Sequence, residues 1–116
     1  NLHKILELRG MLKPWVKVDI LSLRDFPEYV QPEETGSTFE ENASMKALHA
    51  AQTLDVLALA DDSGLVVPSL GGEPGIYSAR YAGEGASDRE NRSKLVEKLK
   101  TLKESERTGY FECVLA

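Results

Sequence analysis

The chain has 116 residues, 41% of them hydrophobic, and its 14 basic and 19 acidic residues give a net charge of −5. This composition is typical of a globular domain and excludes a wholly disordered chain. No apolar run approaches the ~20 residues of a membrane-spanning helix. The acidic balance argues against direct nucleic-acid binding, which usually requires a basic surface. Because Cys113 is the single cysteine, an internal disulfide is excluded and a reducing, cytoplasmic location is expected.

The two ends of the chain indicate a piece of a longer protein. The first residue is Asn1 rather than methionine, and residues 108–116 are rich in β-forming side chains and end in an apolar run. A strand that ended there would expose its hydrogen-bonding edge and its apolar face. We therefore expect residues 1–116 to form part of a larger domain, with the thiol of Cys113 buried on this strand.

The first half of the chain predicts two helices separated by a strand and a loop. Apolar residues at three- and four-residue steps predict a helix over residues 2–13. Alternation of apolar and charged residues predicts a strand over residues 16–23. Two prolines, a glycine and four acids predict a loop over residues 25–38. The capping-box pattern occurs twice, starting at Ser37 and at Thr38, so an alanine-rich helix should begin at one of them and run to about residue 53.

The second half of the chain predicts short alternating elements. A capping box formed by Ser87 and Glu90, followed by leucines at helical spacing, predicts a helix that runs to about residue 102. The other expectations are a buried strand over residues 56–60, a turn over 61–64, a hairpin strand over 65–67, a Gly-rich loop over 71–85 and a strand over 108–116. This alternation of helices and strands predicts the α/β fold class.

The segment Ala60-Asp61-Asp62-Ser63-Gly64 is the strongest local signal for chemistry. We expect its two carboxylates at the carboxyl end of a buried strand, which is the edge where open α/β sheets bind ligands. Adjacent acids repel each other when they are buried, and a Mg²⁺ ion would compensate them. The same residues also favour an ordinary turn, so the motif alone leaves both interpretations open.

The acidic loop and the helix that follows it form a second candidate. Lys46 interrupts a helix surface of small apolar residues and shares a face with Asn42, so it could meet a phosphate, although most lysines extend to solvent. The acids before it could serve a site or simply compensate the helix dipole. The segment Asn1-Leu2-His3-Lys4 at the first helix is a weaker candidate phosphate loop. Arg80, between two tyrosines, could contact a phosphate or pair with an acid.

Four segments, taken together, resemble the inosine/xanthosine triphosphate pyrophosphatase family. They are Asn1-x-x-Lys4, Glu33-Glu34-Thr35-Gly36-Ser37-Thr38-Phe39-x-Glu41-Asn42-Ala43-x-x-Lys46-Ala47, Ala60-Asp61-Asp62-Ser63-Gly64-Leu65 and Leu70-Gly71-Gly72-x-Pro74-Gly75-x-Tyr77-Ser78-Ala79-Arg80-Tyr81. Their order and spacing are continuous over nearly the whole chain. A fifth segment, Thr108-x-x-Phe111-x-Cys113, resembles the family's next strand.

The resemblance implies an elongated, two-lobed α/β fold in which helices flank a mixed central sheet. Residues 1–116 would be a partial domain of this kind, without the family's first strand and without the C-terminal half that recognises the purine base. The implied activity is hydrolysis of ITP, dITP and XTP to the nucleoside monophosphate and pyrophosphate, with Mg²⁺ as cofactor and in a homodimer. A catalytically silent nucleotide-binding module, or an inactive fragment, is the alternative.

The resemblance also implies which residues contact the substrate. Asn1 and Lys4 match the end of the family's N-terminal phosphate loop. Lys46 matches a helix lysine that faces the triphosphate, and Ser63 adjoins the substrate.

Acidic residues take the metal and the catalytic roles that the resemblance implies. Asp62 matches both a magnesium-linked acid and the proposed base that activates water. Glu34 matches the second magnesium-linked acid, and Glu28 and Asp61 are its rivals.

Overall fold

The computed structural model describes residues 2–15, 17 and 19–116, and the chain divides into two compact units, Asn1–Val30 and Gln31–Ala116. In the first unit, helix α1 (Leu2–Leu12) confirms the helix predicted for residues 2–13. Arg9 on α1 donates hydrogen bonds from Nε and Nη2 to the carbonyl oxygen of Ile20, at 2.8 and 2.5 Å. This contact fastens the segment that follows α1 to the helix.

The strand predicted for residues 16–23 is wrong in the part of that segment that the structure describes. Residue 17 and residues 19–22 are irregular, Leu23 begins a 3-10 helix (Leu23–Asp25), and residues 16 and 18 lie outside the described residues. The apolar alternation is compatible with a strand, but a strand also needs a neighbour to take up its backbone hydrogen bonds. The sheet of the described residues consists of two strands, and neither lies in this unit.

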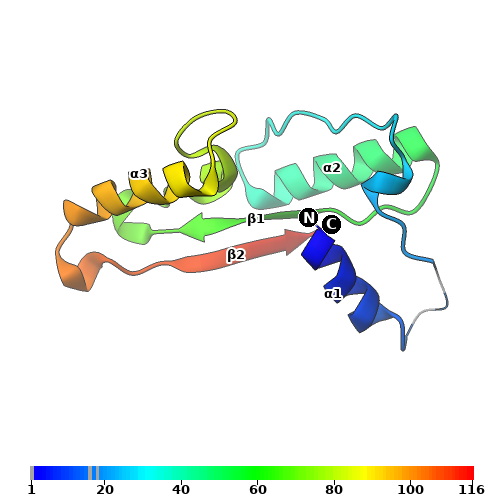
Figure 1. The fold of residues 1–116 in the computed structure, drawn as a ribbon, viewed down its shortest axis with the longest axis horizontal. Coiled ribbons are helices and arrows are strands. Elements are labelled where there is room, and N and C mark those ends of the chain that lie inside the picture. The colour runs from blue at the N-terminus through cyan, green and yellow to red at the C-terminus, as the bar shows by residue number, and fades with distance from the viewer. Residues whose placement is uncertain (1, 16, 18) are drawn as a thin grey trace. The chain divides into compact units, whose positions relative to one another are not determined.

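The second unit combines helices with a two-stranded antiparallel sheet, which confirms the α/β class. Its helices and strands are α2 (Phe39–Leu54), β1 (Asp61–Val66), α3 (Asp88–Lys100) and β2 (Tyr110–Leu115), with 3-10 helices at Pro68–Leu70, Gly75–Arg80 and Glu104–Glu106. Figure 1 shows α2 and α3 one after the other beside β1. α2 packs against both strands, whereas α3 packs against the 3-10 helix Gly75–Arg80.

Both predicted helix starts in this unit are confirmed. Thr38 is the N-cap of α2, and its hydroxyl accepts the N–H of Glu41 at 3.1 Å. The Glu41 carboxylate in turn accepts the N–H of Ser37 at 2.7 Å. At α3 the reciprocal capping box forms, because Ser87 N–H donates to Glu90 at 2.7 Å and Glu90 N–H donates to the Ser87 hydroxyl at 3.3 Å. These side chains satisfy the N–H groups that a helix leaves unpaired at its start.

The position of β1 differs from the prediction. The strand expected at residues 56–60 and the turn expected at 61–64 are both wrong, because β1 itself occupies Asp61–Val66. The pairing with β2 extends along the whole strand, from Asp61 opposite Leu115 to Val66 opposite Tyr110. A long-range partner therefore overrides the local turn preference of these residues. The separate hairpin strand expected at 65–67 is wrong as well, because Leu65 and Val66 belong to β1; Val66 also forms an isolated bridge to Pro74.

The side chains of β1 alternate between the two faces of the sheet. Asp62 is buried on the face that α2 covers. Asp61 and Ser63 share the opposite face, where the Ser63 hydroxyl donates to the Asp61 carboxylate at 3.0 Å. Cys113 lies opposite Ser63 in the ladder and is exposed. The expected burial of this thiol is therefore wrong, because its side chain points away from α2.

The core of the described residues is small and partly polar. Its buried side chains are Phe39, Ala43, Val67 and Tyr81 together with Asn42, Asp62 and Asn91. Gly64 lets β1 approach the 3-10 helix Gly75–Arg80, because a Cβ at Gly64 would lie 2.2 Å from the Gly75 carbonyl oxygen and 2.6 Å from the Ser78 hydroxyl. Among the helices of the described residues, none has both the length and the apolar character needed to cross a bilayer.

The close approach at Gly64 leads to a prediction about stability. We expect Gly64→Ala to lower the free energy of unfolding by about 1–3 kcal/mol, as overpacked core positions do. Gly10→Ala is the control, because a Cβ there meets nothing within 4 Å, and alanine inside a helix should be neutral or stabilising by about 0.5–1 kcal/mol. Urea unfolding of the full-length protein measures both, and equal effects would contradict the packing argument.

Candidate functional site

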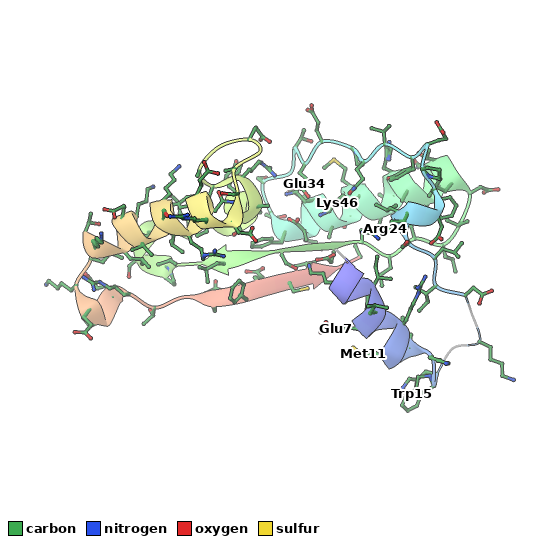
Figure 2. The ribbon with its side chains drawn as sticks, in the orientation of Figure 1. Glu7, Met11, Trp15, Arg24, Glu34 and Lys46 are labelled. Carbon is green, nitrogen blue, oxygen red and sulfur yellow. The ribbon has the colours of Figure 1, made fainter. Side chains whose placement is uncertain are left out.

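Lys46 lies between two carboxylates that come from different elements. Its Nζ is 2.8 Å from Glu34 Oε1, in the loop before α2, and 3.0 Å from Asp62 Oδ1, on β1. The three side chains are 16%, 25% and 8% exposed, respectively. Figure 2 shows Glu34 and Lys46 side by side at α2. The expectation that Lys46 could extend to solvent is therefore wrong, because two buried or half-buried acids hold its ammonium group.

Asn42 joins the same cluster from one turn earlier on α2. Its side chain is fully buried; Oδ1 accepts the N–H of Gly36 at 2.8 Å, and Nδ2 donates to Asp62 Oδ2 at 3.4 Å. Gly36 is close to Glu34 in the chain, so the contacts close into a ring. This ring consists of Glu34, Lys46, Asp62, Asn42 and Gly36. This ring fastens the loop to α2 and to β1 at once.

Arg80 approaches the ring from the 3-10 helix Gly75–Arg80. Its Nη1 is 2.9 Å from Glu34 Oε2, its Nε is 3.5 Å from the exposed Glu84 carboxylate, and its guanidinium carbon lies 5.4 Å from the centre of the Tyr77 ring. Of the two roles that the sequence left open for Arg80, the structure shows the pairing with an acid. We define the acid–base cluster as Glu34, Lys46, Asp62 and Arg80.

The acid–base cluster has two positive and two negative side chains, so its formal charge is zero. Burial raises the pKa of Glu34, but the hydrogen bonds from Lys46 and Arg80 outweigh it and leave the pKa below its ordinary value. Burial likewise lowers the pKa of Lys46, and the hydrogen bonds to Glu34 and Asp62 reverse the direction, so this pKa is raised. Pairing therefore keeps Glu34 and Lys46 charged near neutral pH.

The expected Asp61–Asp62 pair does not form. Adjacent residues of a strand point to opposite faces, so Asp62 faces the acid–base cluster while Asp61 faces away with Ser63. The sequence suggested a metal because two neighbouring buried carboxylates would repel each other. That argument does not apply here, because only Asp62 faces the cluster. Lys46 balances the charge of Asp62.

The remaining predicted site residues are not among the four that define the acid–base cluster. Lys4, in the first turn of α1, and Glu28 belong to the unit Asn1–Val30. Asn1 lies outside the described residues. The structure thus brings together Lys46, Glu34 and Asp62 of the predicted set, and the roles of all the predicted site residues stay predictions.

The acidic stretch around the start of α2 divides into two kinds of residue. Glu33, Glu40 and Glu41 are exposed, and Glu41 bonds to Ser37 at the helix start, as expected for acids that compensate a helix dipole. Glu34 alone is half-buried and paired with two cations. The spacing of four residues placed Asn42 on the helix face of Lys46, and the contact of Asn42 with Asp62 is what the sequence did not predict.

The carboxylates of the acid–base cluster are chemically suited to a hard divalent cation. Glu34 Oε1 and Asp62 Oδ1 converge on one nitrogen, so the loop and β1 aim two carboxylate oxygens at a single cation. Mg²⁺ prefers such oxygen ligands, usually one or two carboxylates together with substrate phosphates. Within the described residues, no group of three or more His, Cys, Asp or Glu side chains is placed to hold a metal. The two acids are therefore suited, by chemistry and placement, to supply oxygen ligands to such an ion.

Comparison with known proteins identifies the family. The model of the Ham1 family matches residues 1–116, and the chain belongs to this family. It is 55% identical over 117 residues to a dITP/XTP pyrophosphatase of Protochlamydia amoebophila. The aligned region covers 100% of this chain and 59% of that relative. A dITP/XTP pyrophosphatase of Geobacter sulfurreducens is 49% identical, with coverage of 100% and 58%. The chain thus spans less than two thirds of the length of these relatives.

Solved structures agree with the fold. A HAM1 protein from Coxiella burnetii matches with a TM-score of 0.90 at 41% identity, over 100% of this chain and 58% of that protein. The Ham1 protein of Staphylococcus aureus matches with a TM-score of 0.80 at 45% identity, over 99% and 57%. The resemblance inferred from the motifs is confirmed.

The paired state of Glu34 leads to a prediction about acid stability. Because its folded pKa lies below the unfolded value of about 4.3, Glu34 stabilises the fold above that pH, and the contribution is lost as the pH falls through the folded pKa. We expect Glu34→Gln to lower stability near neutral pH and to reduce its loss on acidification. Unfolding followed from about pH 6 to about pH 3 measures this. Glu33→Gln, at the neighbouring exposed position, is the control and should leave the dependence of the unfolding free energy on pH as it is in the wild type. The same dependence in Glu34→Gln as in the wild type would contradict the pairing.

Proposed function

We propose that the protein containing this chain hydrolyses non-standard purine nucleoside triphosphates (ITP, dITP and XTP) to the monophosphate and pyrophosphate. It would thereby remove deaminated purines from the nucleotide pool. Two relatives at 55% and 49% identity carry the name dITP/XTP pyrophosphatase. The observation that carries the proposal is the convergence of Glu34 and Asp62 on Lys46, since phosphoryl chemistry depends chiefly on placed charges.

Asp62 acts as the base in this proposal. Its carboxylate accepts a proton from a water molecule as the water oxygen attacks the α-phosphorus. The new P–O bond forms while the anhydride bond between the α- and β-phosphates breaks, so the products are the monophosphate and pyrophosphate. Asn42 holds Oδ2 of Asp62, which leaves the orientation of the carboxylate defined. Asp62 is the buried acid of the acid–base cluster, and this restricts its access to bulk water.

Lys46 neutralises phosphate charge. An ammonium group has three N–H donors, and among the described residues Glu34 and Asp62 take two of them. The third can donate to a phosphate oxygen, where a charge-assisted hydrogen bond is strong. Asn1, Lys4 and Ser63 contribute further substrate contacts in this proposal, on the basis of the family resemblance.

Asp62 and Glu34 would hold Mg²⁺, with Glu28 and Asp61 as rivals for the second position. When bound, the ion supplies charge neutralisation on the phosphates and makes a bound water more acidic. The two acids fit this role because they already converge on one cation. The homodimer, the cytoplasmic location and the absence of direct nucleic-acid binding belong to the same proposal. They follow from the family resemblance, the single cysteine and the acidic composition, respectively.

Product analysis on the full-length protein tests the proposed function. We expect magnesium-dependent release of pyrophosphate from ITP, dITP and XTP, and weak release from GTP and ATP. Orthophosphate in place of pyrophosphate would contradict the assigned bond. Binding of ITP without turnover would indicate a catalytically silent nucleotide-binding module instead.

The role of Asp62 leads to a prediction about turnover. Asp62→Asn keeps the shape of the side chain but cannot accept the proton, so we expect kcat for ITP to fall by about 10²–10⁴-fold, the usual contribution of a general base. Asp55→Asn is the matched control, because Asp55 is exposed and caps the end of α2 in a left-handed conformation that asparagine also adopts readily. Turnover near the wild-type level in Asp62→Asn would rule out the proposed base.

A further inference from the structure

We propose that Arg80 is a positioning residue for this reaction: it holds Glu34 in the orientation in which Glu34 and Asp62 converge. The inference rests on the proposed function, and it adds a residue that acts through Glu34 rather than on the substrate. Arg80 Nη1 donates to Glu34 Oε2 at 2.9 Å, while Glu34 Oε1 accepts from Lys46 at 2.8 Å. The two oxygens of one carboxylate are thus held by cations from two different elements.

Glu34 needs such support because its backbone is irregular. It lies in the segment between Gln31 and the start of α2, where the structure assigns no helix or strand. Side-chain contacts therefore decide where its carboxylate lies. Lys46 alone could hold one oxygen and leave the carboxylate free to rotate about that contact. The hydrogen bond from Arg80 Nη1 to the second oxygen removes this freedom, because both oxygens of the carboxylate are then held.

The backbone around Arg80 is fixed from α3. Asn91 is buried; its Nδ2 donates to the Ala79 carbonyl oxygen at 3.0 Å, and its Oδ1 accepts the Ala82 N–H at 2.8 Å. Lys94 Nζ donates to the carbonyl oxygen of Tyr81 at 2.6 Å. Backbone groups on both sides of Arg80 are therefore bound by side chains of a regular helix. The backbone position from which the Arg80 side chain extends is therefore fixed.

The other end of this 3-10 helix is fixed to β1. The Ser78 hydroxyl accepts the N–H of Leu65 at 2.9 Å and donates to the Gly75 carbonyl oxygen at 2.6 Å. Asp62 lies on the same strand. Arg80 thus connects Glu34 to the strand that carries the proposed base, and the distance between the two acids depends on both connections.

The surroundings of Arg80 favour positioning over direct substrate contact. Its Nη1 and Nε face the carboxylates of Glu34 and Glu84, and its guanidinium lies over the Tyr77 ring. These partners take Nη1 and Nε and balance the positive charge of Arg80, which leaves less of that charge for a phosphate. A positioning residue keeps them throughout, so its loss acts on turnover through Glu34 and leaves the affinity for the nucleotide unchanged.

The test is a double-mutant cycle in the full-length protein with ITP as substrate. We expect Arg80→Met to lower kcat by about 10–100-fold, the usual effect of losing a residue that orients a metal-linked carboxylate, with KM for ITP unchanged. In a Glu34→Gln background, Arg80→Met should have almost no further effect, because both substitutions disrupt the same contact. Thermal unfolding of the wild type, the two single variants and the double variant measures the contact independently of activity. The effects of the two substitutions on the free energy of unfolding should be non-additive as well.

The controls separate the possible outcomes. Arg92→Met, at an exposed position on α3, should leave kcat unchanged, and Arg80→Lys should restore part of the lost turnover because it keeps the charge without the planar fork. A rise in KM, or a full further loss of kcat in the Glu34→Gln background, would overturn the inference in favour of direct substrate contact. Absence of pyrophosphate release from the wild type would instead refute the proposed function, and the unfolding cycle would still decide whether Arg80 holds Glu34.

Discussion

Asp62 is a carboxylate with only 6% of its surface exposed, and burial of an unpaired charge is costly. The ammonium of Lys46 meets this requirement at 3.0 Å, and Asn42 donates to the second oxygen. Because Lys46 and Asn42 lie one turn apart on α2, this pairing aligns the helix with β1. Removal of Lys46 would leave the Asp62 carboxylate buried without a cation, which is the strongly destabilising case for an ion pair. The packing of α2 on the sheet therefore depends on this polar contact as much as on the small apolar core.

The contact at Asp62 extends outward in two directions. Through Asn42 it reaches the N–H of Gly36, where a Cβ would come within 2.6 Å of the Asn42 side-chain oxygen. Through Lys46 and Glu34 it reaches Arg80, whose neighbouring backbone groups are bound by α3. Residues of α2, α3, the 3-10 helix Gly75–Arg80 and β1 thus bear on the position of two carboxylates. Such a network places charge rigidly, which suits a reaction that depends on placed charge.

The motifs that resemble the family coincide with this network. The acid–base cluster and Asn42 all come from the three longer segments on which the resemblance was based. The glycines of these segments have a structural reason as well: Gly36 and Gly64 are positions where a side chain would collide with neighbouring atoms. Within the second unit, the segments on which the resemblance rests therefore hold both the residues that carry charge in the cluster and the glycines that allow the backbone to approach it.

The helices could be predicted from the sequence because their rules are local. The starts of α2 and α3 are marked by capping residues a few positions away, and the structure confirms both. The acids and the lysine of the cluster were also identified as candidates, from their motifs. Tertiary structure alone decided the register of β1, because a strand is defined by its distant partner β2. That register turned Asp62 toward Lys46 and Asp61 away, since neighbouring side chains of a strand face opposite sides. It also decided that Arg80 pairs with Glu34, because the two residues are 46 positions apart and no local pattern relates them.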